Sequence, residues 1–76
     1  MYIVLEIQTG ETISVLVNTY EERPQAEHKY HEILGYAATS EIPIHSAVML
    51  SQEGYYIKSE LYDHVKKEVE PSVIPI

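Results

Sequence analysis

The feature that most constrains the fold of this chain is a hydrophobic period that changes from two residues to about four and then back to two. Residues 2–8 and 12–20 alternate β-branched apolar side chains with polar ones, on either side of Gly10. Two alternating runs joined by a short glycine-containing connection are typical of a β-hairpin. We therefore expect the chain to open with two paired antiparallel strands.

Helical spacing follows this hairpin. Between positions 26 and 37, apolar side chains recur every three or four residues, and charged side chains occupy most positions between them. Pro24 suits the first turn of a helix, where its missing N–H would have no partner in any case. Because the residue before Pro43 is disfavoured in a helix, the helix is predicted to end before that point, over residues 23–39.

Residues 44–51 and 55–62 predict a second hairpin, with Gly54 in its turn. The resulting order, β-β-α-β-β, predicts an α+β fold: a four-stranded antiparallel sheet with one helix packed on one face. A right-handed connection that passes over the first strand would give the spatial order 2-1-3-4. Residues 1–63 are predicted to form this single domain and residues 64–76 a C-terminal arm, since two prolines near the end exclude a regular helix or central strand.

Both faces of the predicted sheet carry apolar side chains. We expect the more aliphatic face to pack under the helix. The residues predicted on that core face are Ile3, Leu5, Ile7, Ile13, Val15, Val17, Ile44, Val48, Leu50, Tyr55, Ile57 and Leu61. The other face is partly apolar through Tyr2, Val4, Leu16, Tyr20, Ala47, Met49, Tyr56 and Tyr62. One helix cannot cover both faces, so we predict a homodimer or higher oligomer with Met49, Tyr56 and Tyr62 at the interface.

Charge and composition exclude several classes of protein. Twelve acidic side chains against five basic ones give a formal charge of −7, so duplex nucleic acid, which is bound through Lys and Arg, is not an expected partner. The absence of cysteine excludes disulfides, a thiolate nucleophile and a zinc finger. No apolar run reaches the roughly 18 residues of a membrane span, and the start of the chain lacks the basic segment of a signal peptide. We therefore expect a cytoplasmic protein without a membrane partner.

Short motifs between residues 30 and 64 form a recognisable set. They are Tyr30-His31-Glu32-Ile33-Leu34, Ala37-Ala38, Ile44-His45-Ser46-Ala47-Val48, Glu53-Gly54 and Tyr62-Asp63-His64. Across about residues 26–64 they resemble a group of short proteins from phages and prophages of Gram-positive bacteria. The resemblance implies a phage accessory protein that works in the cytoplasm of the host cell, and it implies no particular activity. It does not extend to Arg23-Pro24 or to the C-terminal arm.

The histidines are the first candidates for metal binding or acid–base chemistry. His28 and His31 lie three apart on the predicted helix beside carboxylates, but no third helix ligand accompanies them, so no metal or cofactor is expected. His45 and His64 are predicted at the same end of the sheet, next to Asp63. A histidine oriented there by Asp63 could serve as an acid or base, although such a group is more often a hydrogen-bonded strand end. With no strained serine turn and no glycine-rich phosphate loop, we expect no enzyme activity.

Three functions remain, none of them catalytic. In the first, an oligomeric binder sequesters a small nucleotide-type immune signal of the host, with tyrosines stacked on the base and the cations Arg23, Lys29 and Lys58 on the phosphates where subunits join. The predicted ligand-binding residues are Arg23, His31, His45, Tyr56, Lys58, Tyr62 and His64. In the second, the acidic surface inhibits a host defence protein, as a nucleic-acid mimic or an anti-CRISPR type of inhibitor. The third is a structural or assembly factor.

Overall fold

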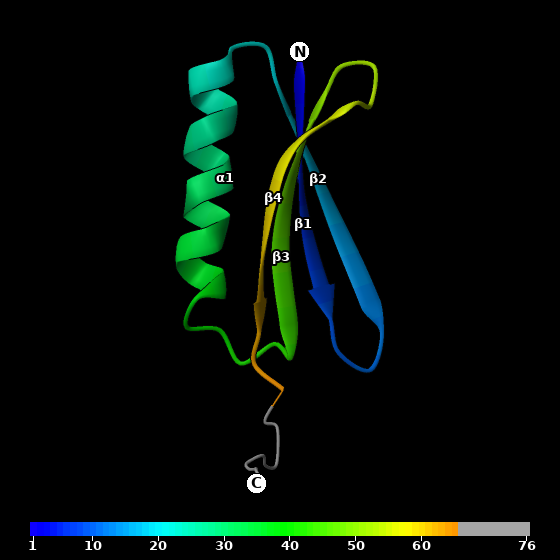
Figure 1. Cartoon of the computed structure of the whole chain (residues 1–76), viewed down its shortest axis with the longest axis vertical. Helices are drawn as coiled ribbons and strands as arrows, with labels where there is room; N and C mark the ends of the chain where they lie inside the picture. Colours follow the sequence, from blue (N-terminus) through cyan, green and yellow to red (C-terminus); the bar gives the residue numbers. More distant parts are fainter. Residues whose placement is uncertain (66–76) are drawn as a thin grey trace, which may run out of the picture.

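The computed structural model describes residues 1–65 and has the predicted order β-β-α-β-β (Figure 1). Its elements are β1 (Tyr2–Thr9), β2 (Ile13–Tyr20), α1 (Arg23–Ala37), β3 (Ile44–Ser51) and β4 (Tyr56–Asp63). The four strands form one antiparallel sheet in the order β2-β1-β3-β4, and α1 packs against one face of it. The predicted fold class and strand order are confirmed. Of the predicted C-terminal arm, residues 66–76 lie outside the described part of the chain.

Helix α1 has Pro24 in its first turn and ends at Ala37, two residues before the predicted end. Just past its C-terminus the chain makes a tighter turn, in which the N–H of Thr39 donates to the carbonyl of Tyr36, three residues earlier, at 3.2 Å. The side chain of His64 closes the same end, donating from Nε2 to the carbonyl of Ala37 at 2.7 Å. These bonds satisfy carbonyl groups that a helix end otherwise leaves unpaired. No helix among residues 1–65 combines the length and apolarity needed to cross a membrane.

The helix covers the sheet face opposite to the predicted one. The buried core beneath it consists of Val4, Ala26, Tyr30, Ile33, Ala47 and Met49. The prediction that the more aliphatic face lies under the helix is therefore wrong. Strands β2 and β3 run parallel, since both are antiparallel to β1, and the handedness of a crossover between parallel strands decides which face its helix takes. Small side chains, such as Ala26 on the helix and Ala47 on β3, let the two layers approach closely.

We call the uncovered side of the sheet the open face. The strand register places on it Ile3, Leu5, Ile7, Thr9, Ile13, Val15, Val17, Thr19, Ile44, Ser46, Val48, Leu50, Tyr56, Ser59, Leu61 and Asp63. Figure 1 shows no element of the described chain over this face. Ile13 is 68% exposed and Val17 62% exposed. Most of the predicted core residues therefore belong to the open face.

A β-bulge changes the direction of side chains at the start of β4. Leu50 pairs with Tyr56 whereas the preceding Met49 pairs with Lys58, so that β4 carries one extra residue, Ile57. Ile57 packs against the core, as predicted, and Lys58 also reaches the helix side, where it contacts α1. The bulge thus turns Tyr56 to the open face, whereas Lys58 faces the helix by regular alternation with Glu60.

Two individual predictions fail for local reasons. Tyr55, predicted in the core, is exposed because it belongs to the turn before β4, where its carbonyl accepts the N–H of Ser51 at 2.8 Å. Met49, predicted at an oligomer interface, is fully buried under α1 because it pairs with Val4 on the helix side of the sheet. Tyr62, also predicted at the interface, pairs with His45 on the same side of the sheet. Any interface on the open face therefore excludes Met49 and Tyr62.

Candidate functional site

The predicted ligand-binding residues do not converge on one point. Three of them surround Glu27 on α1: Arg23, His31 and Lys58. Three others lie where β3 begins and β4 ends: His45, Tyr62 and His64. Tyr56 lies apart from both groups, on the open face. The structure thus divides the predicted site into two clusters and one isolated tyrosine.

Glu27 is the centre of the first cluster. Its Oε2 accepts a hydrogen bond from Arg23 Nε at 3.1 Å, its Oε1 accepts one from Lys58, and His31 Nε2 lies 3.5 Å from Oε1. The hydrogen bond from Lys58 is the largest cause of a lowered Glu27 pKa, and the one from Arg23 adds to it. Lys58 Nζ also lies 4.9 Å from the centroid of the Tyr30 ring, at cation–π distance. Arg23 and Lys58, two of the three cations predicted to contact phosphate, are therefore bound to a carboxylate of their own chain.

The second cluster is held by stacking and strand pairing. The rings of Tyr62 and His64 are nearly parallel, at 8°, with their centroids 6.2 Å apart. His45 pairs with Tyr62 across β3 and β4. Asp63 Oδ1 accepts the backbone N–H of Val65 at 3.0 Å. The side-chain hydrogen bonds of both histidines go to groups other than Asp63, so the acid–base arrangement considered from the sequence is not formed.

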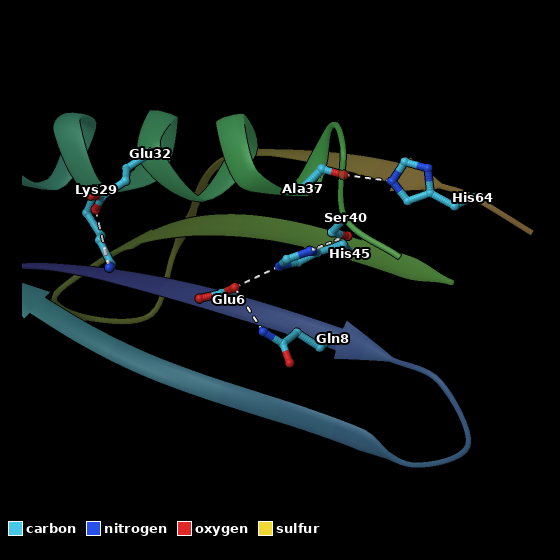
Figure 2. Close-up of polar contacts among 8 residues, drawn as sticks. All are labelled: Glu6, Gln8, Lys29, Glu32, Ala37, Ser40, His45 and His64. Carbon is cyan, nitrogen blue, oxygen red and sulfur yellow. Dashed lines mark hydrogen bonds and ion pairs between the residues drawn. The ribbon is translucent and has the colours of Figure 1, made fainter. Parts of the chain in front are cut away.

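His45, only 3% exposed, is the centre of a buried polar network (Figure 2). Its Nε2 lies 2.7 Å from Oε2 of Glu6, and its Nδ1 lies 3.0 Å from Oγ of Ser40. Gln8 donates from Nε2 to the same Glu6 oxygen at 3.0 Å. Burial acts to raise the pKa of Glu6, but the hydrogen bonds from His45 and Gln8 outweigh it and leave that pKa below its ordinary value of 4.5. The network joins β1, β3 and the connection between α1 and β3.

Glu6 is the polar residue that reasoning from the sequence missed. The inverted face assignment placed it toward solvent, away from the core. In the sheet, Glu6 pairs with Ala47, which puts its side chain on the same face as His45 and within diagonal reach of it. The predicted strand order already placed β1 beside β3. With the correct face under the helix, it would have predicted the contact between Glu6 and His45.

The arrangement of Ser40, His45 and Glu6 contains the types of group found in a nucleophilic triad, but its central imidazole is buried. Acyl transfer requires hydrogen-bond donors aimed at a developing oxyanion, in a pocket that admits the substrate. None of the three residues lines the surface hollow described below. A buried imidazole and a carboxylate that satisfy each other account for the observed contacts. The network therefore serves to tie the strands and the connection together.

Acidification is expected to weaken this network. Because the pKa of Glu6 in the folded state lies below 4.5, its carboxylate stabilises the fold above about pH 4.5, and this contribution is lost as the pH falls through the lowered value. Denaturant unfolding at about pH 6 and about pH 3 should show a smaller loss of stability for Glu6→Gln than for the wild type. Glu41→Gln changes an exposed carboxyl and serves as the control. An unaltered pH dependence in Glu6→Gln would contradict the prediction.

A surface hollow of about 480 Å³ lies between α1 and the end of β2. Its lining consists of Tyr20, Pro24, Gln25, His28, Lys29 and Glu32. Figure 2 shows Lys29 extending from α1 toward the sheet, and its Nζ lies 3.4 Å from Oε1 of Glu32. The volume falls within the range of small-molecule sites. Of the residues predicted to contact a ligand, Lys29 is the one that lines this hollow. The turn between β2 and α1 assembles the rest of it from residues that form no motif.

Metal binding finds no support in the geometry of residues 1–65. No group of three or more His, Asp or Glu residues in this part of the chain is placed to hold a metal ion. His28 lines the hollow whereas His31 lies beside Glu27, so the two histidines have different neighbours. The expected absence of a metal or cofactor stays a prediction.

Known protein families, curated proteins and solved structures give no match to this chain. The resemblance of residues 26–64 to short phage proteins therefore stays a prediction. What the protein can bind has to follow from its own geometry.

Proposed function

We propose that this protein is a non-catalytic phage accessory protein that binds a small nucleotide-type molecule and so removes an immune signal from the host cell. The observation that supports this function best is the hollow between α1 and β2. Its volume of about 480 Å³ suits a small molecule, and its lining combines an aromatic ring, an ammonium group and an imidazole. The phage setting follows from the sequence resemblance.

The lining of the hollow matches the parts of a nucleotide. The ring of Tyr20 offers a face on which a base can stack. Lys29 and His28 supply N–H donors for phosphate oxygens. Gln25 and Glu32 offer amide and carboxylate groups for the edge of the base or the hydroxyls of the ribose. One small site therefore contains a partner for each chemical part of the ligand.

Lys29 is the cation that can change partner at low cost. Its pair with Glu32 is long, at 3.4 Å, and both side chains are partly exposed, which makes such a pair weak. Lys58 is instead bound to Glu27, whose other oxygen binds Arg23. A phosphate in the Glu27 cluster would have to displace a carboxylate, whereas a phosphate in the hollow has only the weak Lys29 pair to displace.

The net charge sets a further condition on the ligand. A chain with a formal charge of −7 repels an anionic nucleotide at long range, so association gains nothing from electrostatic steering. The affinity must therefore come from stacking and hydrogen bonds inside the hollow, which favours a ligand that carries a base as well as phosphate.

Calorimetric titration with cyclic dinucleotides, cyclic trinucleotides and ADP-ribose derivatives tests this function. We expect one member of the panel to bind with a Kd below about 10 μM. Lys29→Ala should weaken that binding about tenfold or more, because a hydrogen bond to a charged group contributes roughly 1.5–3 kcal/mol. Lys58→Ala is the matched control, since Lys58 lies outside the hollow, and it should keep the affinity of the wild type.

The reverse pattern would reject the hollow. If Lys58→Ala or Arg23→Ala weakens binding while Lys29→Ala does not, the ligand occupies the Glu27 cluster, as the residues predicted from the sequence imply. If no member of the panel binds and the protein instead co-purifies in a fixed ratio with a basic host protein, the acidic-inhibitor alternative replaces the nucleotide binder.

A further inference from the structure

The open face is larger and more apolar than a monomer normally exposes. It spans four strands of eight residues, which at the usual spacings gives a surface of roughly 19 by 26 Å. Val15, Val17 and Leu61 on this face are each more than half exposed. Contiguous apolar patches of more than a few hundred Å² mark sites of association.

The helix side provides only a thin core. Three of the buried apolar side chains are alanines: Ala26, Ala37 and Ala47. A chain of this length buries a smaller share of its surface on folding than a larger domain does. Covering the open face would add a second apolar layer to the sheet, built from the larger aliphatic side chains.

Charge distinguishes between the occupants that could cover the open face. Among its described residues, Asp63 at the end of β4 is the one charged side chain, although the whole chain carries −7. An uncharged face can meet its own copy without placing like charges opposite each other. A strongly basic or acidic partner would find no complementary charge there. The chemistry of the open face therefore favours a second copy of this chain.

We infer that two copies of the chain pack open face against open face around a two-fold axis, as a β-sandwich with α1 of each copy on the outside. Facing sheets of this kind lie about 10 Å apart with interdigitated side chains. The footprint of roughly 500 Å² per copy, to which the relief of the side chains adds, is on the order of the 800 Å² per partner of a stable complex. The hollow lies on the α1 side and stays accessible in each copy, so the dimer does not depend on the proposed ligand.

Light scattering coupled to size-exclusion chromatography tests the dimer with the full chain at micromolar concentration. The expected mass is twice the 8.7 kDa of one chain. Val17→Glu should give a monomer, because it places a carboxylate inside the apolar interface. Leu16→Glu is the matched control and should stay dimeric, since Leu16 directly precedes Val17 in β2, is 48% exposed and faces the other side of the sheet.

The wild type provides a second measurement if Val17→Glu does not fold. The melting temperature of a dimer rises with protein concentration, and the wild type should show this rise. A mass of 8.7 kDa with a melting temperature independent of concentration would overturn the inference. It is also overturned if Leu16→Glu dissociates the dimer and Val17→Glu does not, or if Val17→Glu abolishes a stoichiometric complex with a different protein.

Discussion

Replacing His45 with alanine is expected to lower the free energy of unfolding by about 3 kcal/mol. The substitution removes a buried imidazole and leaves the Glu6 carboxylate and the Ser40 hydroxyl without their shared partner. A chain of this length has a total stability of roughly 4–11 kcal/mol. The variant should therefore unfold at a much lower urea concentration than the wild type, which circular dichroism would follow at neutral pH.

Two further variants test whether the loss of stability comes from the contact between His45 and Glu6. One is a control at another histidine, and the other combines both changes. His28→Ala removes an exposed imidazole that lines the hollow and should leave the stability nearly unchanged. Combining Glu6→Gln with His45→Ala should cost less than the sum of the two single changes, because both break the same contact. Additive losses, or a stability of His45→Ala equal to that of His28→Ala, would show that the network contributes little.

The elements and their order follow from local properties of the sequence. A period of two residues and a period near four are each set within a short window, and the crossover rule then limits the strand order to few choices. Which face the helix covers does not follow from such local properties, because both faces of this sheet are apolar. The choice depends on how the chain crosses from β2 over β1 to β3 and on the small Ala47 and Ala26 side chains where the layers meet. Neither appears in the alternation of a single strand.

The polar clusters depend on strand register, which the sequence specifies only weakly. Lys58 reaches Glu27 because β4 pairs with β3 in the register that places Lys58 opposite Met49, on the helix side. Glu6 meets His45 because β1 and β3 pair in one particular register. A shift of one residue in that pairing would send one side chain of the pair to the opposite face. Predictions built on spacing along the chain therefore identified individual polar residues but did not identify the side chains that they contact.

The identity of the covered face also determines which apolar residue matters most to stability within one chain. Met49 is fully buried under α1 and pairs with Val4 on one side and Lys58 on the other. The open-face residue Val15 was predicted in the core, and it is more than half exposed. If the helix covered the more aliphatic face, Met49 would be an exposed residue and Val15 a core residue. Replacing each of the two residues by alanine in a separate variant therefore shows which face the helix covers.

Met49→Ala is expected to lower the free energy of unfolding by about 2–5 kcal/mol, because it removes contacts and leaves a cavity that the surrounding layers close only in part. Leu16→Ala, on the same side of the sheet but half exposed at its edge, should lose less than about 1 kcal/mol. Because the contacts of Met49 lie within one chain, its variant should still associate with wild-type affinity at temperatures where it is folded, whereas Val15→Ala should weaken the dimer. Urea unfolding measures the first quantity and the concentration dependence of the mass measures the second. A Met49→Ala variant as stable as the wild type, with Val15→Ala strongly destabilised at every protein concentration, would return the helix to the face predicted from the sequence.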